Sequence, residues 1–158
     1  MEGVGTITAA DLVRMSLRMR PDRVIVGEVR GAEVIPMLNA MSQGNEGSMC
    51  TLHADSSANA FTKLALYAMQ APERLPLDAT ALLAASAIDL VVFITRRGND
   101  RFVASIRQVV GSDGPRVVTN ELFAPGPDGR AVQSMPIPAS LLDDVAAHGY
   151  DGRGRMPR

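Results

Sequence analysis

One stretch, residues 17–30 (LRMRPDRVIVGEVR), constrains the fold more than any other. Pro21 ends a helix arriving from the N-terminal side, because proline lacks the amide hydrogen and disfavours the α conformation in the residue before it. The β-branched run at 24–26 is typical of a strand buried on both faces of a parallel sheet. Glu28 stands at the C-terminal tip of that strand, where open α/β sheets bind ligands. It is therefore either a catalytic acid or an ordinary solvated residue after a strand.

A second predicted strand with a polar residue at its C-terminal end follows after about the length of one helix. Residues 48–53 alternate apolar with small or polar side chains, as a strand does, and His53 stands at the C-terminal end. Taken alone, His53 is either a functional group or a histidine whose hydrogen bonds are satisfied at a strand end. In a parallel sheet, Glu28 and His53 would lie at the same edge. Two such side chains converging on one edge indicate a functional crevice.

The two stretches resemble the Walker B box and the histidine box of the type II/type IV secretion ATPases, especially the CpaF-like (tight-adherence, Flp pilus) branch. The Walker B pattern is Leu-Arg-x-x-Pro-Asp, four variable residues, then Gly-Glu-apolar-Arg, and residues 17–30 match it at every fixed position. Gly44 and residues 51–54 match the histidine box, but Asn45 replaces its first histidine. The resemblance runs from residue 2 to about residue 110 and includes residues 141–151.

The resemblance implies a set of site residues. ATP hydrolysis needs an acid that orients or deprotonates water, support for Mg²⁺, and donors that sense the γ-phosphate of ATP. By resemblance, Glu28 is the catalytic Walker B glutamate and supports Mg²⁺, directly or through water, while His53 senses the γ-phosphate. Arg18, Arg30 and Thr51 complete the expected ATP-binding set. For Arg14 and Arg18, which share one helix face, the residues alone favour a solvated face over a phosphate contact, and Arg30 is placed to hold Glu28 by an ion pair.

Other chemistries are not supported by the sequence. Cys50 and His53 are three residues apart on one predicted strand, so they point to opposite faces and do not form a nucleophilic dyad. Two histidines and one cysteine make no zinc-site pattern. The formal net charge of −1 gives no support for a general attraction to nucleic acid. A lone cysteine excludes an internal disulfide, which suits a reducing compartment.

A phosphate-binding loop is absent from the sequence. Its Gly-x-x-x-x-Gly-Lys-Ser/Thr motif needs a lysine after a glycine-rich turn, and the only lysine, Lys63, has no such turn before it. We therefore interpret the chain as the C-terminal part of a longer motor, or as a relic of one. ATP would then bind between a phosphate-binding loop outside this sequence and the edge that carries Glu28 and His53.

The resemblance and the hydrophobic periodicity together predict an α/β fold in three segments. Residues 1–96 are expected to form the second half of a RecA-like ATPase core, with a mostly parallel sheet and flanking helices. Residues 97–136 form a small antiparallel β-hairpin extension of the same domain, and residues 137–158 a short helix and a disordered tail. The expected helices are 9–19, 32–42, 58–69, 77–87 and 141–148, and the expected strands are 24–26, 48–53, 90–95, 102–110, 117–123 and 130–135.

Helical spacing also predicts which side chains face the core. In the first helix, for which Thr8 and Asp11 form an expected capping box, the inward residues are Leu12, Met15 and Met19. In the fourth helix they include Leu82. The strand at 90–95 is expected to be buried.

The resemblance implies a hexameric ring that hydrolyses ATP to power pilus assembly or protein secretion. An inner-membrane platform protein would be its partner, no nucleic acid is expected, and the ring would sit at the cytoplasmic face of the inner membrane. The alternative is a non-catalytic RecA-like module that serves assembly or regulation of a secretion system and binds no nucleotide by itself.

Overall fold

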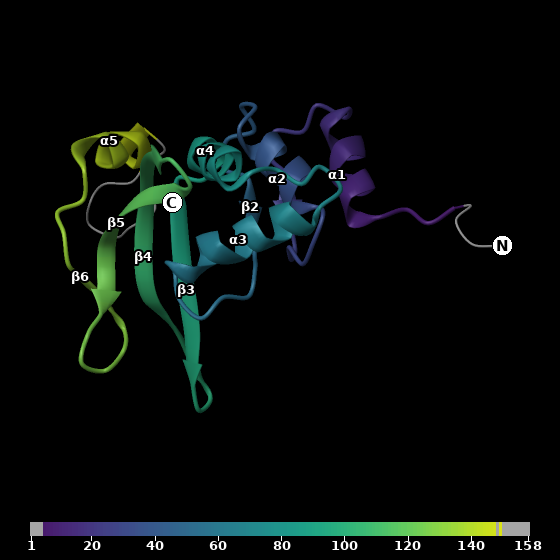
Figure 1. Cartoon of the computed structure of the whole chain (residues 1–158). Coiled ribbons are helices and arrows are strands. Elements are labelled where there is room, and N and C mark those ends of the chain that lie inside the picture. Colours follow the sequence, from purple (N-terminus) through teal and green to yellow (C-terminus); the bar gives the residue numbers. More distant parts are fainter. Residues whose placement is uncertain (1–4, 148, 150–158) are drawn as a thin grey trace.

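The computed structural model describes residues 5–147 and 149, which form an α/β fold (Figure 1). The elements in chain order are α1 (Ala9–Leu17), β1 (Ile25–Val26), α2 (Val34–Met41), β2 (Met49–Cys50), α3 (Asn59–Gln70), α4 (Leu77–Ala87), β3 (Leu90–Arg97), β4 (Asp100–Asp113), β5 (Arg116–Pro125), β6 (Ala131–Gln133) and α5 (Ala139–Ala147).

The described strands form two sheets of different kinds. β1 and β2 pair in parallel, whereas β3, β4, β5 and β6 form an antiparallel sheet in that order. The parallel pairing predicted within residues 1–96 is confirmed for β1 and β2 but is wrong for β3, which joins the antiparallel sheet, and the predicted antiparallel pairing after residue 97 is confirmed for β4 and β5. The physical reason is the short turn at Gly98 and Asn99, where Gly98 has a φ of 60°. Strands joined by so short a connection must pair antiparallel.

Helix α2 forms the centre of the hydrophobic core. Nearly every side chain of this helix is buried, including Val34, Met37 and Leu38. Leu64 from α3 and Ala84 from α4 join the same cluster. α1, α3 and α4 all contact α2, so it is enclosed by other helices (Figure 1). A helix that is apolar all round is expected to be buried in this way.

The N-terminal capping box of α1 is confirmed, but the buried face of that helix is not the predicted one. The Thr8 hydroxyl accepts from the Asp11 amide, and the Asp11 carboxylate accepts from the Thr8 amide. The inward stripe is Ala10, Val13 and Leu17. Val13 forms a small cluster with Val24 and Ala40, and Leu17 packs against that cluster. The side chains predicted to be buried are exposed instead: Leu12, Met15 and Met19. Spacing identifies an apolar stripe, but α1 carries two, and only the tertiary structure selects between them.

The exit from α1 follows the proline argument. The helix ends at Leu17, two residues before the expected end. Arg20 has a φ of 51°, in the left-handed region, and so leaves the helical conformation directly before Pro21. The chain then turns back toward β1.

Strand β1 is buried on one face only, so the prediction of burial on both faces is wrong. Val24 and Val26 pack toward α1 and α2, whereas Ile25 is 66% exposed. Its partner across the pair, Met49, is exposed as well. Because side chains alternate between the two faces of a strand, an apolar run is buried on both faces only where both are covered. Among the described residues, nothing buries the second face.

The same correction applies to β3 and α4. Leu90, Val92 and Ile94 of β3 are exposed, and the exposed positions alternate with partly buried ones, contrary to the prediction of a buried strand. Leu82 of α4 is exposed although it was predicted to face inward. Ala81 and Ala84 of the same helix are buried, Ala84 in the core around α2, and α4 also contacts β4 and β5 of the antiparallel sheet.

The remaining boundaries differ little from the predicted ones. α4 matches its predicted range, and α2 and α3 begin and end within two residues of theirs. β2 is shorter than predicted, while β4 continues through Asp113, where a turn was expected from residue 111. The predicted end of the last helix at His148 and the predicted disordered tail lie outside the described residues. The division of the chain at 96/97 and 136/137 stays a prediction, although β3, assigned to the first segment, pairs with β4. No helix within the described ranges is long and apolar enough to cross a membrane.

Two leucines of α3 provide a test of this core. Leu64 is 1% exposed and Leu66 is 44% exposed on the same helix. We expect Leu64→Ala to lower the free energy of unfolding by about 2–5 kcal/mol, because it leaves a cavity in the core. Leu66→Ala should change it by less than about 1 kcal/mol. Urea denaturation followed by circular dichroism measures both, and equal losses would contradict the proposed core.

Candidate active site

The parallel ladder between β1 and β2 places the predicted site residues together. The Met49 amide donates to the Val24 carbonyl at 3.1 Å, and the Thr51 amide donates to the Val26 carbonyl at 3.3 Å. One further bond, from the Val29 amide to the Thr51 carbonyl at 2.8 Å, extends the pairing past the ends of both strands. The segments that carry Glu28 and His53 therefore remain side by side after the strands end.

Glu28 is the centre of a three-residue cluster. One carboxylate oxygen, Oε2, lies 2.7 Å from Nε of Arg30, and the other, Oε1, lies 2.9 Å from Nε2 of His53. The Glu28 side chain is 26% exposed, whereas Arg30 and His53 are open to solvent on either side of it. The structure thus joins three of the five residues expected from the sequence.

The charges around Glu28 keep it ionised. The hydrogen bond from Arg30 is the largest influence and lowers the pKa of the Glu28 carboxyl. Partial burial acts in the opposite direction, and the charges of Arg30 and His53 lower the pKa further. The same contact raises the pKa of Arg30. At neutral pH the cluster therefore presents a carboxylate, which accepts protons and hydrogen bonds.

One oxygen of that carboxylate has no hydrogen-bond donor. Although Nε2 of His53 is close, the pair lacks hydrogen-bond geometry, and Oε1 of Glu28 is a buried acceptor without a partner among the described residues. A buried polar atom of this kind calls for a donor or a cation that fills the position. Carboxylate oxygen is also the ligand type that Mg²⁺ prefers.

Two other predicted residues have different surroundings. The Thr51 hydroxyl donates to the carbonyl of Gly27 and so ties the two strand tips together. Arg18 is the C-cap residue of α1, is exposed, and makes no hydrogen bond or ion pair through its side chain within the described part of the chain. The structure therefore does not bring Arg18 into contact with the Glu28 cluster.

Sequence reasoning missed Glu33. Its carboxylate accepts from the amides of Arg30 and Gly31 and holds the turn between Glu28 and α2. The available signal was an acid at the start of a predicted helix, where exposed amide groups favour negative charge.

Asn45, which replaces the first histidine of the histidine box, has a structural contact. Its side-chain amide donates to the carbonyl of Ala40 at 2.8 Å, near the C-terminal end of α2. The last carbonyls of a helix lack partners within the helix. Asn45 satisfies one of them.

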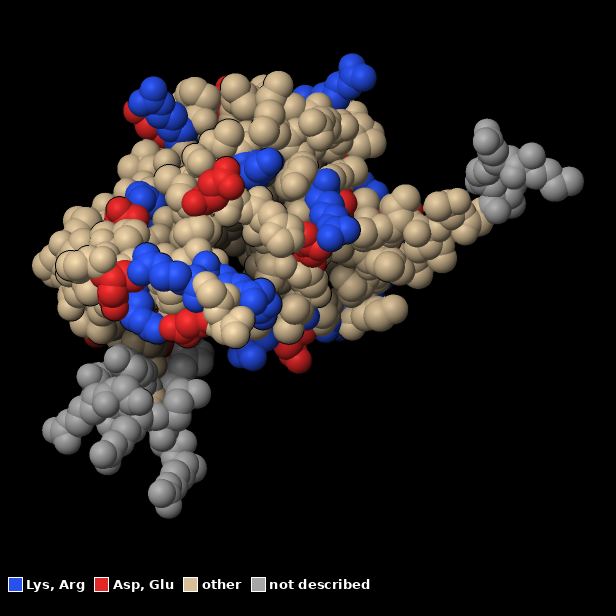
Figure 2. Space-filling view, turned by 90° about the horizontal axis from the view of Figure 1, so that it is seen from below, with Lys and Arg blue, Asp and Glu red and all other residues tan. Residues whose placement is uncertain are grey.

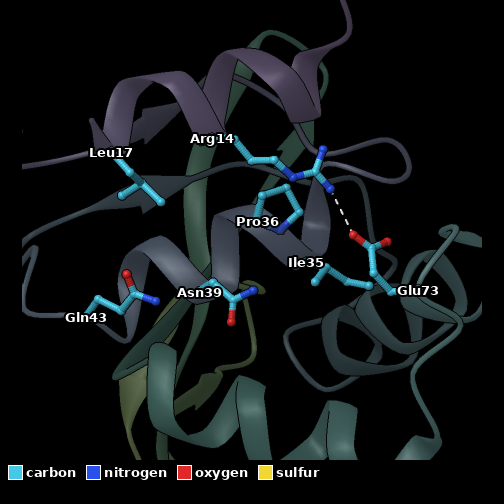
Figure 3. Close-up of a pocket in the computed structure, with 7 residues that line it drawn as sticks. All are labelled: Arg14, Leu17, Ile35, Pro36, Asn39, Gln43 and Glu73. Atoms are coloured by element: carbon cyan, nitrogen blue, oxygen red, sulfur yellow. Dashed lines mark hydrogen bonds and ion pairs between the residues drawn. The ribbon is translucent and has the colours of Figure 1, made fainter. Parts of the chain in front are cut away.

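A surface cavity lies apart from the Glu28 cluster. It has a volume of about 340 Å³ and is lined by residues of α1, α2 and the segment after α3. Arg14 spans it and pairs with Glu73 at 2.8 Å (Figure 3). Arg14 lies on an exposed helix face, as predicted, and the ion pair with Glu73 is an additional contact. Since neither Glu28 nor His53 lines this cavity, the site is an open edge of the parallel pair.

Charged side chains of both signs lie close together on the surface. Blue and red atoms are interspersed on the face in Figure 2, without a large field of one sign. Ion pairs between neighbouring elements contribute to this pattern in the structure, among them Arg130 with Asp100 and with Asp128.

The electrostatics of the site can be tested by titration. We expect Arg30→Met to raise the pKa of Glu28 toward its ordinary value, because the largest lowering influence is removed. His53→Ala should raise it less. In the native protein, the stability that Glu28 contributes is present above its unfolded-state pKa and is lost as pH falls through the folded-state pKa. Arg30→Met should therefore weaken the acid dependence of stability.

The measurement is the pH titration of the Glu28 carboxyl carbon by NMR, with Arg18→Met as the matched control. Arg18 makes no contact with the cluster, so its replacement should leave the titration unchanged. An unchanged Glu28 pKa in Arg30→Met would contradict the assigned cause.

Comparison with known proteins identifies the family of the chain. A family model described as "Type II/IV secretion system protein" matches residues 1–117. A putative conjugal transfer protein of Mycobacterium tuberculosis is 42% identical over 114 residues, which cover 70% of this chain and 32% of that protein. The type IV secretion system protein PtlH of Bordetella pertussis is 39% identical over 93 residues, which cover 58% of this chain and 27% of that protein.

The fold has a counterpart among solved structures. The VirB11 ATPase from the Brucella suis type IV secretion system, in complex with sulphate, superposes with a TM-score of 0.60 at 32% identity. The match covers 63% of this chain and 31% of VirB11. The chain spans about a third of the length of these relatives. With its two strand-tip motifs, its fold and these similarities, the chain belongs to the type II/IV secretion ATPase family.

Proposed function

We propose that this chain supplies the water-activating edge of an ATPase motor that drives pilus assembly or protein secretion. The observation that carries the proposal is Glu28, held ionised between Arg30 and His53 at the tips of two parallel strands. Membership in the type II/IV secretion ATPase family supports the class of reaction. The CpaF-like branch and the Walker B and histidine-box roles are part of the proposal.

The residues present fit Mg²⁺-bound ATP at this edge. When bound, Mg²⁺-ATP supplies the phosphoryl group that is transferred to water and the cation that offsets its charge. Oε1 of Glu28 is a buried carboxylate oxygen that accepts no hydrogen bond from the described residues, although Nε2 of His53 lies 2.9 Å away, and such an oxygen suits a water molecule or a hydrated cation. Glu28 then orients the water and accepts its proton. It does so as a carboxylate, which is the form that Arg30 favours.

The neighbouring residues have supporting roles in this proposal. His53 is 90% exposed and lies beside Oε1, so its imidazole is free to donate to the γ-phosphate. Arg30 orients the Glu28 carboxylate, and Thr51 holds the strand tips in register. We keep Arg18 as a nucleotide contact, supplied from the end of α1. A motor of this kind also needs a phosphate-binding loop, and the 158 residues contain no such motif.

The assembly around the site is also proposed. The family resemblance implies a homo-hexamer at the cytoplasmic face of the inner membrane, docked on a platform protein of that membrane. In such rings, arginines of neighbouring subunits complete the nucleotide site. An exposed cluster such as Glu28, Arg30 and His53 is suited to completion by other parts of an assembly.

A second candidate is a non-catalytic assembly or regulatory module. The absence of a phosphate-binding loop from the sequence favours it, because the chain by itself lacks the amide cradle and lysine that hold ATP phosphates. The intact mass of the native gene product, together with the reading frame upstream of Met1, separates the candidates. A product much larger than 16.8 kDa with a Gly-Lys-Thr loop supports the motor. A product of 16.8 kDa that binds no ATP supports the module.

The role of Glu28 is tested by Glu28→Gln in the full-length protein. The amide keeps the shape of the side chain but accepts protons poorly. We therefore expect the turnover number for ATP to fall by about 10²–10⁴-fold. The dissociation constant for a fluorescent ATP analogue should stay within about threefold, because binding does not depend on the proton acceptor.

Glu73→Gln is the matched control for this experiment. It makes the same chemical change beside the cavity that Arg14 lines, where it removes an exposed ion pair with Arg14. Turnover should remain close to that of the native protein. Full turnover in Glu28→Gln would sink the assignment of Glu28, and a selective loss in Glu73→Gln would point to the other cavity.

A further inference from the structure

The segment that carries His53 is anchored at its two ends. Upstream, Thr51 bonds to the β1 side through its amide, carbonyl and hydroxyl groups. Residues 52–55 then make no hydrogen bond to any other described residue, and the contact of His53 with Glu28 is an ion-pair contact. Downstream, Ser56 accepts from the amides of Asn59 and Ala60 at the start of α3. The position of His53 therefore depends on where the start of α3 is held.

Ser57, just before the start of α3, links this part of the chain to the antiparallel sheet. The residue is 2% exposed, and its hydroxyl oxygen accepts from the hydroxyl of Ser105 at 2.8 Å. It also accepts from Nε of Arg107 at 3.3 Å. Ser105 and Arg107 lie two residues apart on β4, so both point to the same face of the sheet. Ser57 follows His53 by only four residues.

All three nitrogens of the Arg107 guanidinium are used. Besides Nε, Nη1 donates to the hydroxyl of Thr119 at 3.1 Å, and Nη2 lies 2.9 Å from the carboxylate of Glu121. Both partners are on β5, and the Arg107 side chain is only 17% exposed. The pairing of β4 with β5 shifts register between Ile106 and Arg107. Irregularities of this kind change the direction in which nearby side chains point.

We propose that Arg107 is a positioning residue that holds the His53 segment in place through Ser57. The inference rests on the proposed function, because it assigns the antiparallel sheet a part in aligning His53. A planar guanidinium reaches three acceptors on two elements at fixed angles, which an ammonium group does not reproduce. Loss of Arg107 would leave Ser57 and Glu121 without their shared donor and weaken the downstream anchor of the His53 segment, for which the hydrogen bond from Ser105 would remain.

The test is a double-mutant cycle in the full-length ATPase. Arg107→Met should lower the turnover number by about 10- to 100-fold, as expected when a reacting group is misplaced. The KM for ATP should change by less than about twofold, because Arg107 makes none of the contacts that bind the substrate and the transition state equally. In a His53→Ala background, Arg107→Met should lower turnover by less than about twofold further, because the residue it positions is already absent.

The controls separate positioning from general stability. Arg101→Met removes an exposed arginine from the same strand and should leave turnover unchanged. Arg107→Lys keeps the charge but should restore little turnover. Ser57→Ala, which removes a single hydroxyl group, should reproduce the loss and serves as the test if Arg107→Met does not fold. An equal loss from Arg107→Met in both backgrounds, or no loss at all, would overturn the inference.

Hydrogen exchange gives an independent readout when turnover of His53→Ala is too low to measure. In Arg107→Met, amide exchange in residues 52–60 should accelerate while exchange in α2 stays the same. Unchanged exchange in residues 52–60 would overturn the inference. Failure of the proposed function would show differently, as full ATP turnover in Glu28→Gln. If Glu28→Gln loses turnover while the effects of Arg107→Met and His53→Ala are additive, only the role of Arg107 is rejected.

Discussion

The parallel hydrogen-bond ladder between the two shortest strands is the constraint on which the site depends. It runs from Val24 to Thr51 and continues past the strand ends through the amide of Val29. In a parallel pair both chains end at the same edge, so whatever follows each strand meets there. The buried helix α2 connects the two strands and is enclosed by three other helices. The ladder and this core together hold Glu28 and His53 at one edge.

The chemistry of that edge follows from an imbalance around one carboxylate. Arg30 satisfies one oxygen of Glu28 and favours its ionised form, while the other oxygen is buried and lacks a hydrogen bond. A carboxylate satisfied on both sides would be a structural ion pair. In the proposed function, the oxygen of Glu28 that accepts no hydrogen bond within the described part of the chain is the position for a further ligand. The exposure of Arg30 and His53 leaves room for that ligand to approach.

The antiparallel sheet contributes a second, less obvious support. It contacts α4 over a broad surface and reaches the start of α3 through a buried polar network around Arg107. Buried networks of this kind are costly when partly satisfied, and they specify one arrangement when complete. The loop that carries His53 therefore lies between the parallel ladder on one side and the antiparallel sheet on the other. Its geometry is a property of both sheets.

The sequence by itself determined the local features of this protein. The capping box at Thr8 and Asp11, the extent of α4, and the presence of acidic and imidazole groups at two strand tips depend on neighbouring residues. Short-range hydrogen bonding and fixed side-chain periodicity encode such features directly. Pairing Glu28 with His53 needed only one further assumption, that the two strands are parallel.

The tertiary structure alone decided which surfaces are buried and what supports the site. Some side chains are as apolar as the core and yet exposed, among them Ile25, Leu82 and the outer stripe of α1. Burial requires a neighbouring element, and the local sequence pattern does not identify that element. The antiparallel arrangement of β3 likewise depends on the hairpin that follows it. The contact of Arg107 with Ser57 joins residues 50 positions apart. Periodicity says which side chains share a face, but only packing of the whole chain decides what that face meets.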